Sequence, residues 1–140
     1  MDITLRYQGG KRFEAVARGH RVVSDQPLDN KGNDTGMTPP ELFLSSLAAC
    51  AGYYAAEYLN TRKLPSGELE IRVSASKGEK PARLGSIQIE VIAPGLDPRQ
   101  REGILRAVDA CLLANTLRVP PKIEISIAPA VAPADLPISA

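Results

Sequence analysis

The residues of this chain with the most reactive side chains are two cysteines, Cys50 and Cys111. A thiolate can attack a peroxide and become a sulfenic acid, and a second thiol then converts this acid to a disulfide. Two thiols therefore predict peroxide chemistry. Free cysteine is also among the most buried residue types, so core packing is the alternative explanation, and it is the favoured one for either cysteine considered alone.

A reactive Cys50 needs a nearby cation, because apolar surroundings raise the pKa of a thiol and only the thiolate is nucleophilic. Ser46 and Tyr54 lie one helical turn on either side of Cys50, where each could donate a hydrogen bond to it. The cationic candidates come from the N-terminal segment: Lys11, Arg12, Arg18 and Arg21. The residues alone do not choose among these four.

Metal chemistry is not expected. The two cysteines and the one histidine, His20, lack the CxxC or CxxH spacing of soft-metal sites. His20 fits a turn or strand residue better than a general base. We therefore predict no metal site.

Charge and hydropathy narrow the class of protein further. The net charge of +1 gives no electrostatic reason to expect nucleic acid or an anionic membrane as a partner. No run is apolar enough to span a bilayer, and the first residues lack the basic and apolar regions of a signal peptide. We expect a cytoplasmic protein, in which a static disulfide is unusual.

A long helix is predicted to carry Cys50. Thr38 fits an N-cap, Pro39 the first helical position, and Glu41 the third position, from which its side chain can bond back to the Thr38 amide. The helix should run to about Arg62, and it is apolar on all sides over residues 42–56, which is typical of a central, buried helix. Nine residues of helix put Glu41 roughly 13 Å from Cys50. Glu41 could therefore meet a thiol only across an interface between two copies.

The other elements follow from the same patterns. The second helix begins after Asp97 and ends near Cys111, and a loop that is long and often functional separates the N-terminal strands from the first helix. Alternating apolar residues or turn residues predict strands at 2–8, 12–18, 20–24, 68–76, 86–93 and 122–128, the loop at 25–37, and a hairpin connection at 77–81.

This order predicts an α+β fold, with helices on one face of a largely antiparallel sheet. Residues 1–128 form one domain, and residues 129–140 form an Ala/Pro-rich tail. The central helix is very apolar, and the chain has few aromatic residues, which indicates that the helix is buried against a second copy. We therefore expect a homodimer.

The chain resembles the OsmC/Ohr family, which comprises osmotically inducible protein C and the organic hydroperoxide resistance proteins. The resemblance rests on short blocks in the same order as in the family: Gly9-Gly10-Lys11-Arg12-Phe13, Thr38-Pro39-Pro40-Glu41-Leu42-Phe43, Leu47-Ala48-Ala49-Cys50, and Cys111 followed by Asn115-Thr116-Leu117. It covers about residues 1–128.

The resemblance implies an OsmC-like fold, an intertwined homodimer with active sites at the subunit interface, and reduction of organic hydroperoxides in oxidative-stress defence. It matches Cys50 to the peroxidatic thiol and Cys111 to the resolving thiol. Arg12 would stabilise the thiolate, and Glu41 would support that arginine. A dithiol reductant of the lipoyl or thioredoxin type would then reduce the disulfide, and the resemblance implies that no cofactor such as a metal, haem or flavin is needed.

Three departures from the family pattern support a second hypothesis. Counting back from Cys50, Pro40 occupies the place of the family's glutamate, so that Glu41 is one residue late. Lys11 competes with Arg12, and Leu112 replaces the proline that commonly follows the second cysteine. These changes are typical of the OsmC-like branch. The alternative is a non-catalytic dimer that binds an apolar small molecule or acts as a redox sensor.

Overall fold

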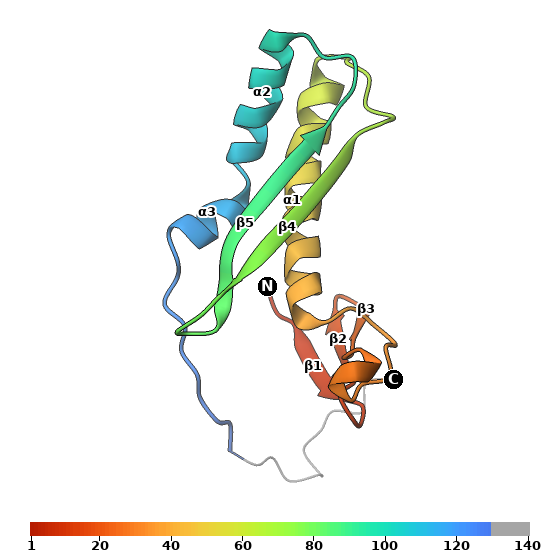
Figure 1. The fold of residues 1–140 in the computed structure, drawn as a ribbon, viewed down its shortest axis with the longest axis vertical. Helices are drawn as coiled ribbons and strands as arrows, with labels where there is room; N and C mark the ends of the chain where they lie inside the picture. Colours follow the sequence, from red (N-terminus) through yellow and green to blue (C-terminus); the bar gives the residue numbers. More distant parts are fainter. Residues whose placement is uncertain (130–140) are drawn as a thin grey trace.

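The computed structural model describes residues 1–129, so all but the first residue of the predicted tail lies outside the described part (Figure 1). It has two antiparallel sheets and three α-helices, which confirms the α+β class. The elements in chain order are β1 (Thr4–Tyr7), β2 (Phe13–Ala17), β3 (His20–Ser24), the 3-10 turn η1 (Leu28–Asn30), α1 (Pro39–Thr61), β4 (Glu70–Gly78), β5 (Arg83–Ile92), α2 (Pro98–Asp109) and α3 (Leu112–Arg118).

Helix α1 begins as its sequence predicts. The Thr38 backbone N–H and hydroxyl donate to Glu41 Oε2 over 2.7 and 2.8 Å, so the two residues form a capping box. The helix lies between the other elements and buries one stripe, made of Leu47, Ala51, Ala55 and Leu59. Its opposite face is uncovered in the single chain, where Tyr53 is 63% exposed.

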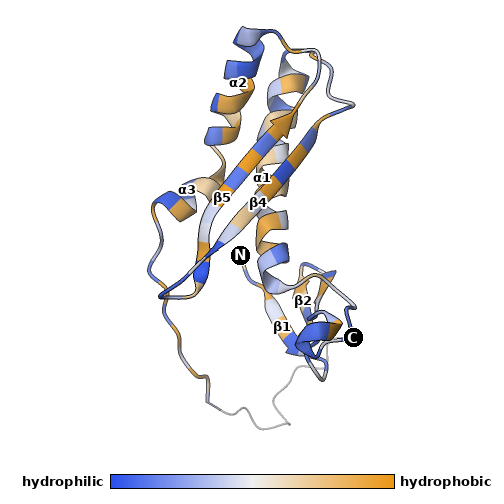
Figure 2. Ribbon diagram, viewed as in Figure 1, coloured by the Kyte–Doolittle hydropathy of each residue, from blue (hydrophilic) through white to orange (hydrophobic). Residues whose placement is uncertain are grey.

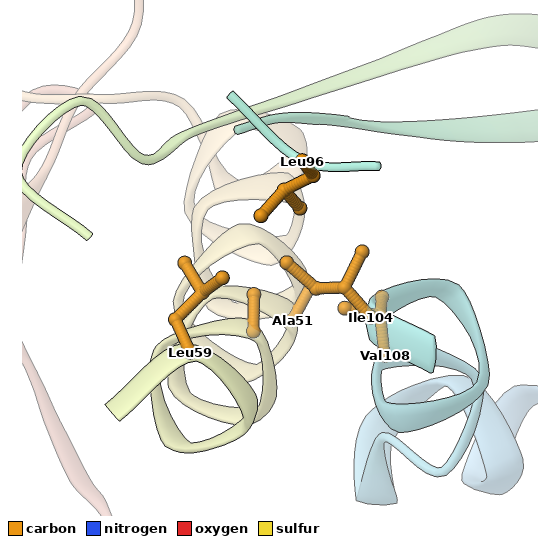
Figure 3. Close-up of a cluster of buried hydrophobic side chains, with 6 residues drawn as sticks. Ala51, Leu59, Leu96, Ile104 and Val108 are labelled. Atoms are coloured by element: carbon orange, nitrogen blue, oxygen red, sulfur yellow. The ribbon is translucent and has the colours of Figure 1, made fainter. Parts of the chain in front are cut away.

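The core lies where α1, α2 and the β4–β5 hairpin meet. Leu59 and Ala51 of α1 face Ile104 and Val108 of α2, with Leu96 beside them (Figure 3). The hairpin alternates apolar and polar residues along its strands, and its half-buried apolar side chains pack against this cluster (Figure 2). Gly103 permits the close approach of the helices, because a Cβ there would collide with the Tyr58 hydroxyl. The core thus fixes α2 against the C-terminal half of α1.

The N-terminal sheet lies apart from this core. Strands β1, β2 and β3 pair in order, and Figure 1 shows them beyond the N-terminal end of α1, away from β4 and β5. Every residue of β1 is exposed, including Leu5 at 58% and Tyr7 at 65%. The alternating pattern therefore forms the predicted strands, but among residues 1–129 nothing covers the apolar residues of β1, whereas β2 is half-buried.

The predicted strand at 122–128 is wrong for the single chain. These residues are irregular, and Ile123, Ile125 and Ile127 are 80%, 94% and 95% exposed. A strand needs a neighbour for its backbone N–H and C=O groups, and no described strand lies in register with this segment. The sequence pattern predicted a backbone conformation, but it could not supply the partner that the conformation requires.

Two further features differ from the prediction. The hairpin connection is shorter than expected because β5 already begins at Arg83. Helix α2 ends at Asp109, close to the predicted end near Cys111, and it is followed by a helix that was not predicted, α3, which starts at Leu112. Cys111 therefore lies at a helix–helix junction, not at a simple helix end. Across residues 1–129, no helix combines the length and apolar character that crossing a bilayer requires.

Candidate active site around two thiols

The structure brings the two cysteines together. The sulfur of Cys111 lies 2.7 Å from that of Cys50 and donates a hydrogen bond to it, although 61 residues separate them in sequence. The two thiols differ in access: Cys50 is half-buried in the middle of α1, and Cys111 is fully buried. Any reagent from solvent would therefore meet Cys50 first.

The junction between α2 and α3 holds Cys111 by its backbone. The Cys111 N–H donates to the Val108 carbonyl over 3.0 Å, and its own carbonyl accepts from the Asn115 N–H over 3.0 Å. The residue thus closes the last turn of α2 and opens α3, of which it is the N-cap. Because α2 packs against α1 in the core, this junction lies next to the middle of α1, where Cys50 lies.

Burial raises the pKa of the Cys111 thiol, and the hydrogen bond to Cys50 raises it further. The first backbone amides of α3, at Ala114 and Leu113, partly offset this shift. Cys111 therefore keeps its proton near neutral pH and acts as the donor in the pair.

Arg12 and Glu41 are not brought to the thiols within one chain. Arg12 is half-buried in the turn between β1 and β2, and these strands lie beyond the N-terminal end of α1 (Figure 1). Glu41 is exposed and holds Thr38, whose backbone N–H lowers the pKa of the Glu41 carboxyl. Within residues 1–129, Cys111 is the one hydrogen-bonding partner of Cys50. The other candidate cations of the N-terminal segment are exposed, and Arg21 pairs with Glu14 over 2.5 Å.

A groove that the sequence did not reveal runs beside the thiols. Its inner part is a cavity of about 430 Å³ between α1, β5 and α3, lined by Leu47 and Ala114, which lie one turn from Cys50 and Cys111. Its outer part is a largely apolar cavity of about 760 Å³ that reaches Phe43 and the rim cations Lys77 and Arg83. Both parts share the lining residues Leu84, Ile87 and Leu117. No sequence spacing could predict this groove, because α1, β4, β5 and α3 all contribute to it.

The long loop before α1 is organised by one carboxylate, which sequence reasoning also missed. Asp25 is 1% exposed, and its oxygens accept from the backbone N–H groups of Gln26, Asn33 and Thr35 over 2.8, 3.2 and 3.1 Å, and from the Thr35 hydroxyl over 2.7 Å. The Thr35 hydroxyl is the largest cause that lowers the pKa of Asp25 from 3.8 to about 2. The loop therefore has a fixed shape, and it connects β3 to the start of α1.

Replacing Asp25 by Asn should lower the melting temperature at neutral pH. A depressed carboxyl pKa stabilises the fold fully above pH 3.8, and this contribution is lost as the pH falls through about 2. The variant should lack that part of the acid dependence, which thermal melts over this pH range would measure. Asp29→Asn, an exposed residue of η1, is the matched control. Equal melting temperatures for both variants would contradict the assignment.

Comparison with known proteins decides the family. The family model described as OsmC-like protein matches residues 32–126, which include both cysteines and Glu41. The chain belongs to the OsmC-like family. A search of curated protein sequences found no match.

Solved structures share the fold of this OsmC-like chain. A protein from Psychrobacter arcticus 273-4, associated with osmotic stress and detoxification, superposes with a TM-score of 0.74 at 20% identity, over 81% of this chain and 85% of that one. The OsmC-like protein of Mycoplasma pneumoniae gives 0.70 at 23% identity, over 84% and 86%. The organic hydroperoxide resistance protein OsmC of Legionella pneumophila gives 0.58 at 18% identity, over 84% and 90%. These likenesses confirm the OsmC-like fold.

Proposed function

We propose that this OsmC-like protein is a thiol-dependent peroxidase that reduces organic hydroperoxides in oxidative-stress defence. The observation that carries the proposal is the thiol pair. Cys50 and Cys111 lie 2.7 Å apart, and Cys50 is the accessible member. Core packing explains a buried cysteine, but it gives no reason for two free thiols in direct contact beside a groove.

The reaction consists of two steps. The Cys50 thiolate attacks the outer peroxide oxygen, the O–O bond breaks, and the alcohol leaves with a proton as Cys50 becomes a sulfenic acid. Cys111 then attacks the Cys50 sulfur, the S–S bond forms, and hydroxide leaves as water with the Cys111 proton. The thiols lose two electrons and the peroxide gains them. An external dithiol, of the lipoyl or thioredoxin type, restores the pair in the cytoplasm.

The relatives support the substrate class. The structures from Legionella pneumophila and Elizabethkingia anophelis carry the name organic hydroperoxide resistance protein, at 18% and 21% identity. The groove beside the thiols also suits an organic peroxide better than hydrogen peroxide, because its outer part is largely apolar and burying an alkyl group there is favourable.

A second copy completes the site in this proposal. The single chain leaves three apolar surfaces uncovered, which belong to β1, to Tyr53 of α1 and to residues 122–128. Exposed apolar area of this extent marks an interaction surface, and an unpaired strand edge readily accepts another strand. An intertwined homodimer would bury these surfaces and would bring Arg12 and Glu41 of one copy to Cys50 of the other. Arg12 would stabilise the thiolate there, and Glu41 would orient Arg12.

The test is disulfide formation by the purified, reduced protein. One equivalent of cumene hydroperoxide should convert the chain within seconds to a form with an internal Cys50–Cys111 disulfide, visible as a mobility shift on a nonreducing gel and by mass spectrometry. Equimolar hydrogen peroxide should act more slowly, because it cannot use the apolar groove. Oxidation no faster than that of a free thiol at the same pH would refute the peroxidase.

The second candidate function is a non-catalytic dimer that binds an apolar small molecule. The observation that favours it is the outer cavity of about 760 Å³, together with the distance of Arg12 and Glu41 from the thiols in one chain. A protein of this kind would retain both thiols after the same dose of peroxide. It would also raise the fluorescence of an apolar dye, and Leu84→Arg within the groove would abolish that signal.

A further inference from the structure

We propose that Arg118 is a positioning residue for Cys111, which it holds within reach of Cys50 by clamping α3 to α2. This inference rests on the proposed function for its role in turnover. The geometry of the clamp itself is independent of the reaction. It concerns the second chemical step, the attack of Cys111 on oxidised Cys50.

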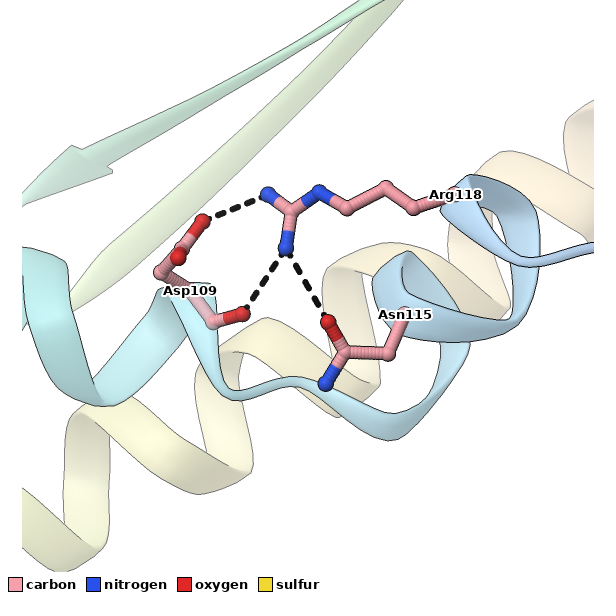
Figure 4. Close-up of polar contacts among 3 residues, drawn as sticks. All are labelled: Asp109, Asn115 and Arg118. Atoms are coloured by element: carbon pink, nitrogen blue, oxygen red, sulfur yellow. Dashed lines mark hydrogen bonds and ion pairs between the residues drawn. The ribbon is translucent and has the colours of Figure 1, made fainter.

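The clamp is a set of three contacts made by one guanidinium (Figure 4). Nη2 of Arg118 donates to Asp109 Oδ1 over 2.5 Å, and Nη1 donates to the Asp109 carbonyl over 3.0 Å and to Asn115 Oδ1 over 3.1 Å. Asp109 is the last residue of α2, and Arg118 is the last residue of α3. The contact therefore closes the chain around the junction that contains Cys111.

The clamp matters because packing holds α3 only in part, through the half-buried Leu113 and Ala114. The helix has seven residues and buries none of them, whereas α1 and α2 each bury several. Cys50 is fixed in a helix of 23 residues, so the orientation of the α2–α3 junction sets the distance between the sulfurs. A planar guanidinium with several donors can hold a carboxylate, a carbonyl and an amide oxygen in one arrangement. The rate of an intramolecular attack falls steeply when the reacting atoms are misplaced by about 1 Å.

The experiment separates the two chemical steps in the full-length protein. Arg118 lines the inner part of the groove but does not contact Cys50, so in Arg118→Ala the reaction of Cys50 with hydrogen peroxide, which does not use the groove, should keep its rate. Formation of the disulfide should be roughly tenfold slower, as expected when a reacting group loses its orientation. Dimedone, which captures sulfenic acids, should therefore label more Cys50, and excess peroxide should yield more sulfinic acid. Arg118→Lys, which keeps a charge for Asp109, should restore part of the rate.

Arg106→Ala is the matched control, since Arg106 is an exposed α2 arginine that pairs with Glu102 over 3.7 Å. It should leave both steps unchanged. A general loss of stability in Arg118→Ala would lower the melting temperature and slow both steps, whereas loss of positioning changes the ratio of the second step to the first. An unchanged ratio in Arg118→Ala would overturn the proposal.

A parallel experiment with diamide, a thiol oxidant, makes this test independent of the peroxidase proposal. Diamide takes two electrons and two protons from a thiol pair and leaves a disulfide and a hydrazine, so its second step also requires Cys111 to reach Cys50. That step should slow in Arg118→Ala even if wild-type protein fails to react with peroxide. A peroxide-inert wild type with a slowed diamide step would refute the peroxidase and support the clamp. Equal diamide rates in both proteins would overturn the clamp.

Discussion

Cys50→Ser should lose single-turnover reduction of cumene hydroperoxide, with the rate of thiol loss falling by at least about a thousandfold. A hydroxyl is not ionised near neutral pH and cannot replace a thiolate as nucleophile. The remaining thiol, Cys111, is fully buried and its pKa is raised, so it should stay protonated and out of reach of the peroxide. Free thiols counted over seconds after one equivalent of peroxide would measure the effect.

Cys111→Ser is the matched variant, and it should keep the first chemical step but lose the second. Peroxide should still be consumed at Cys50, but the reaction should stop at a sulfenic acid that dimedone captures. Equal and rapid thiol loss in wild type and Cys50→Ser would reverse the assignment of the two roles. A Cys111→Ser protein that consumes no peroxide would instead show that the Cys111 thiol itself is needed for the first step.

Mixed dimers of Cys50→Ser and Arg12→Ala chains should regain about half of the wild-type activity, although each variant alone is nearly inactive. Removing a cation that stabilises developing charge typically costs about 10²–10³ in rate. If Arg12 serves the thiol of the other copy, a mixed dimer contains one complete site and one site that lacks both groups. If Arg12 serves its own chain, neither site is complete and no activity returns.

For this measurement the two variant chains carry different affinity tags. Mixed dimers are then purified over both tags and assayed at once. Lys11→Ala is the control, because Lys11 is the exposed neighbour of Arg12 and competes for the same role. If mixed dimers that contain Arg12→Ala regain activity and Lys11→Ala homodimers are fully active, Arg12 is assigned as the activating cation. Absence of recovery would place the activating group within the same chain and remove the structural argument for a shared site.

Local chemistry explains which features could be predicted from the sequence. The Thr38–Glu41 capping box and the start of α2 at Pro98 depend on residues that are neighbours in the chain, and both are present. The alternating residues of β4 and β5 likewise need only the adjacent hairpin strand. Each of these elements finds its partners nearby, so the pattern was sufficient.

Features that depend on distant or absent partners could not be predicted in the same way. The strand at 122–128 has the right pattern, yet it has no described neighbour with which to pair. Asp25 was one polar residue among many in a loop, and only the folded loop shows its four hydrogen bonds. Helix α3 was not predicted, because Cys111 at its N-cap is not one of the usual capping residues. The role proposed for Arg118 depends on its contact with Asp109, the last residue of the preceding helix α2.

The uncovered apolar segments also affect the folding of a newly made chain. Residues 122–128 offer alternating isoleucines that pair with no strand among residues 1–129, and β1 is an exposed edge of its sheet. Such edges pair with whatever strand arrives first, so a lone chain is at risk of aggregation until a suitable surface covers them. Correct pairing and aggregation both depend on encounters between chains, which makes the yield of refolding a matter of concentration and time. The same surfaces would make chain supply and chaperone capacity the limits on how much usable protein a cell obtains.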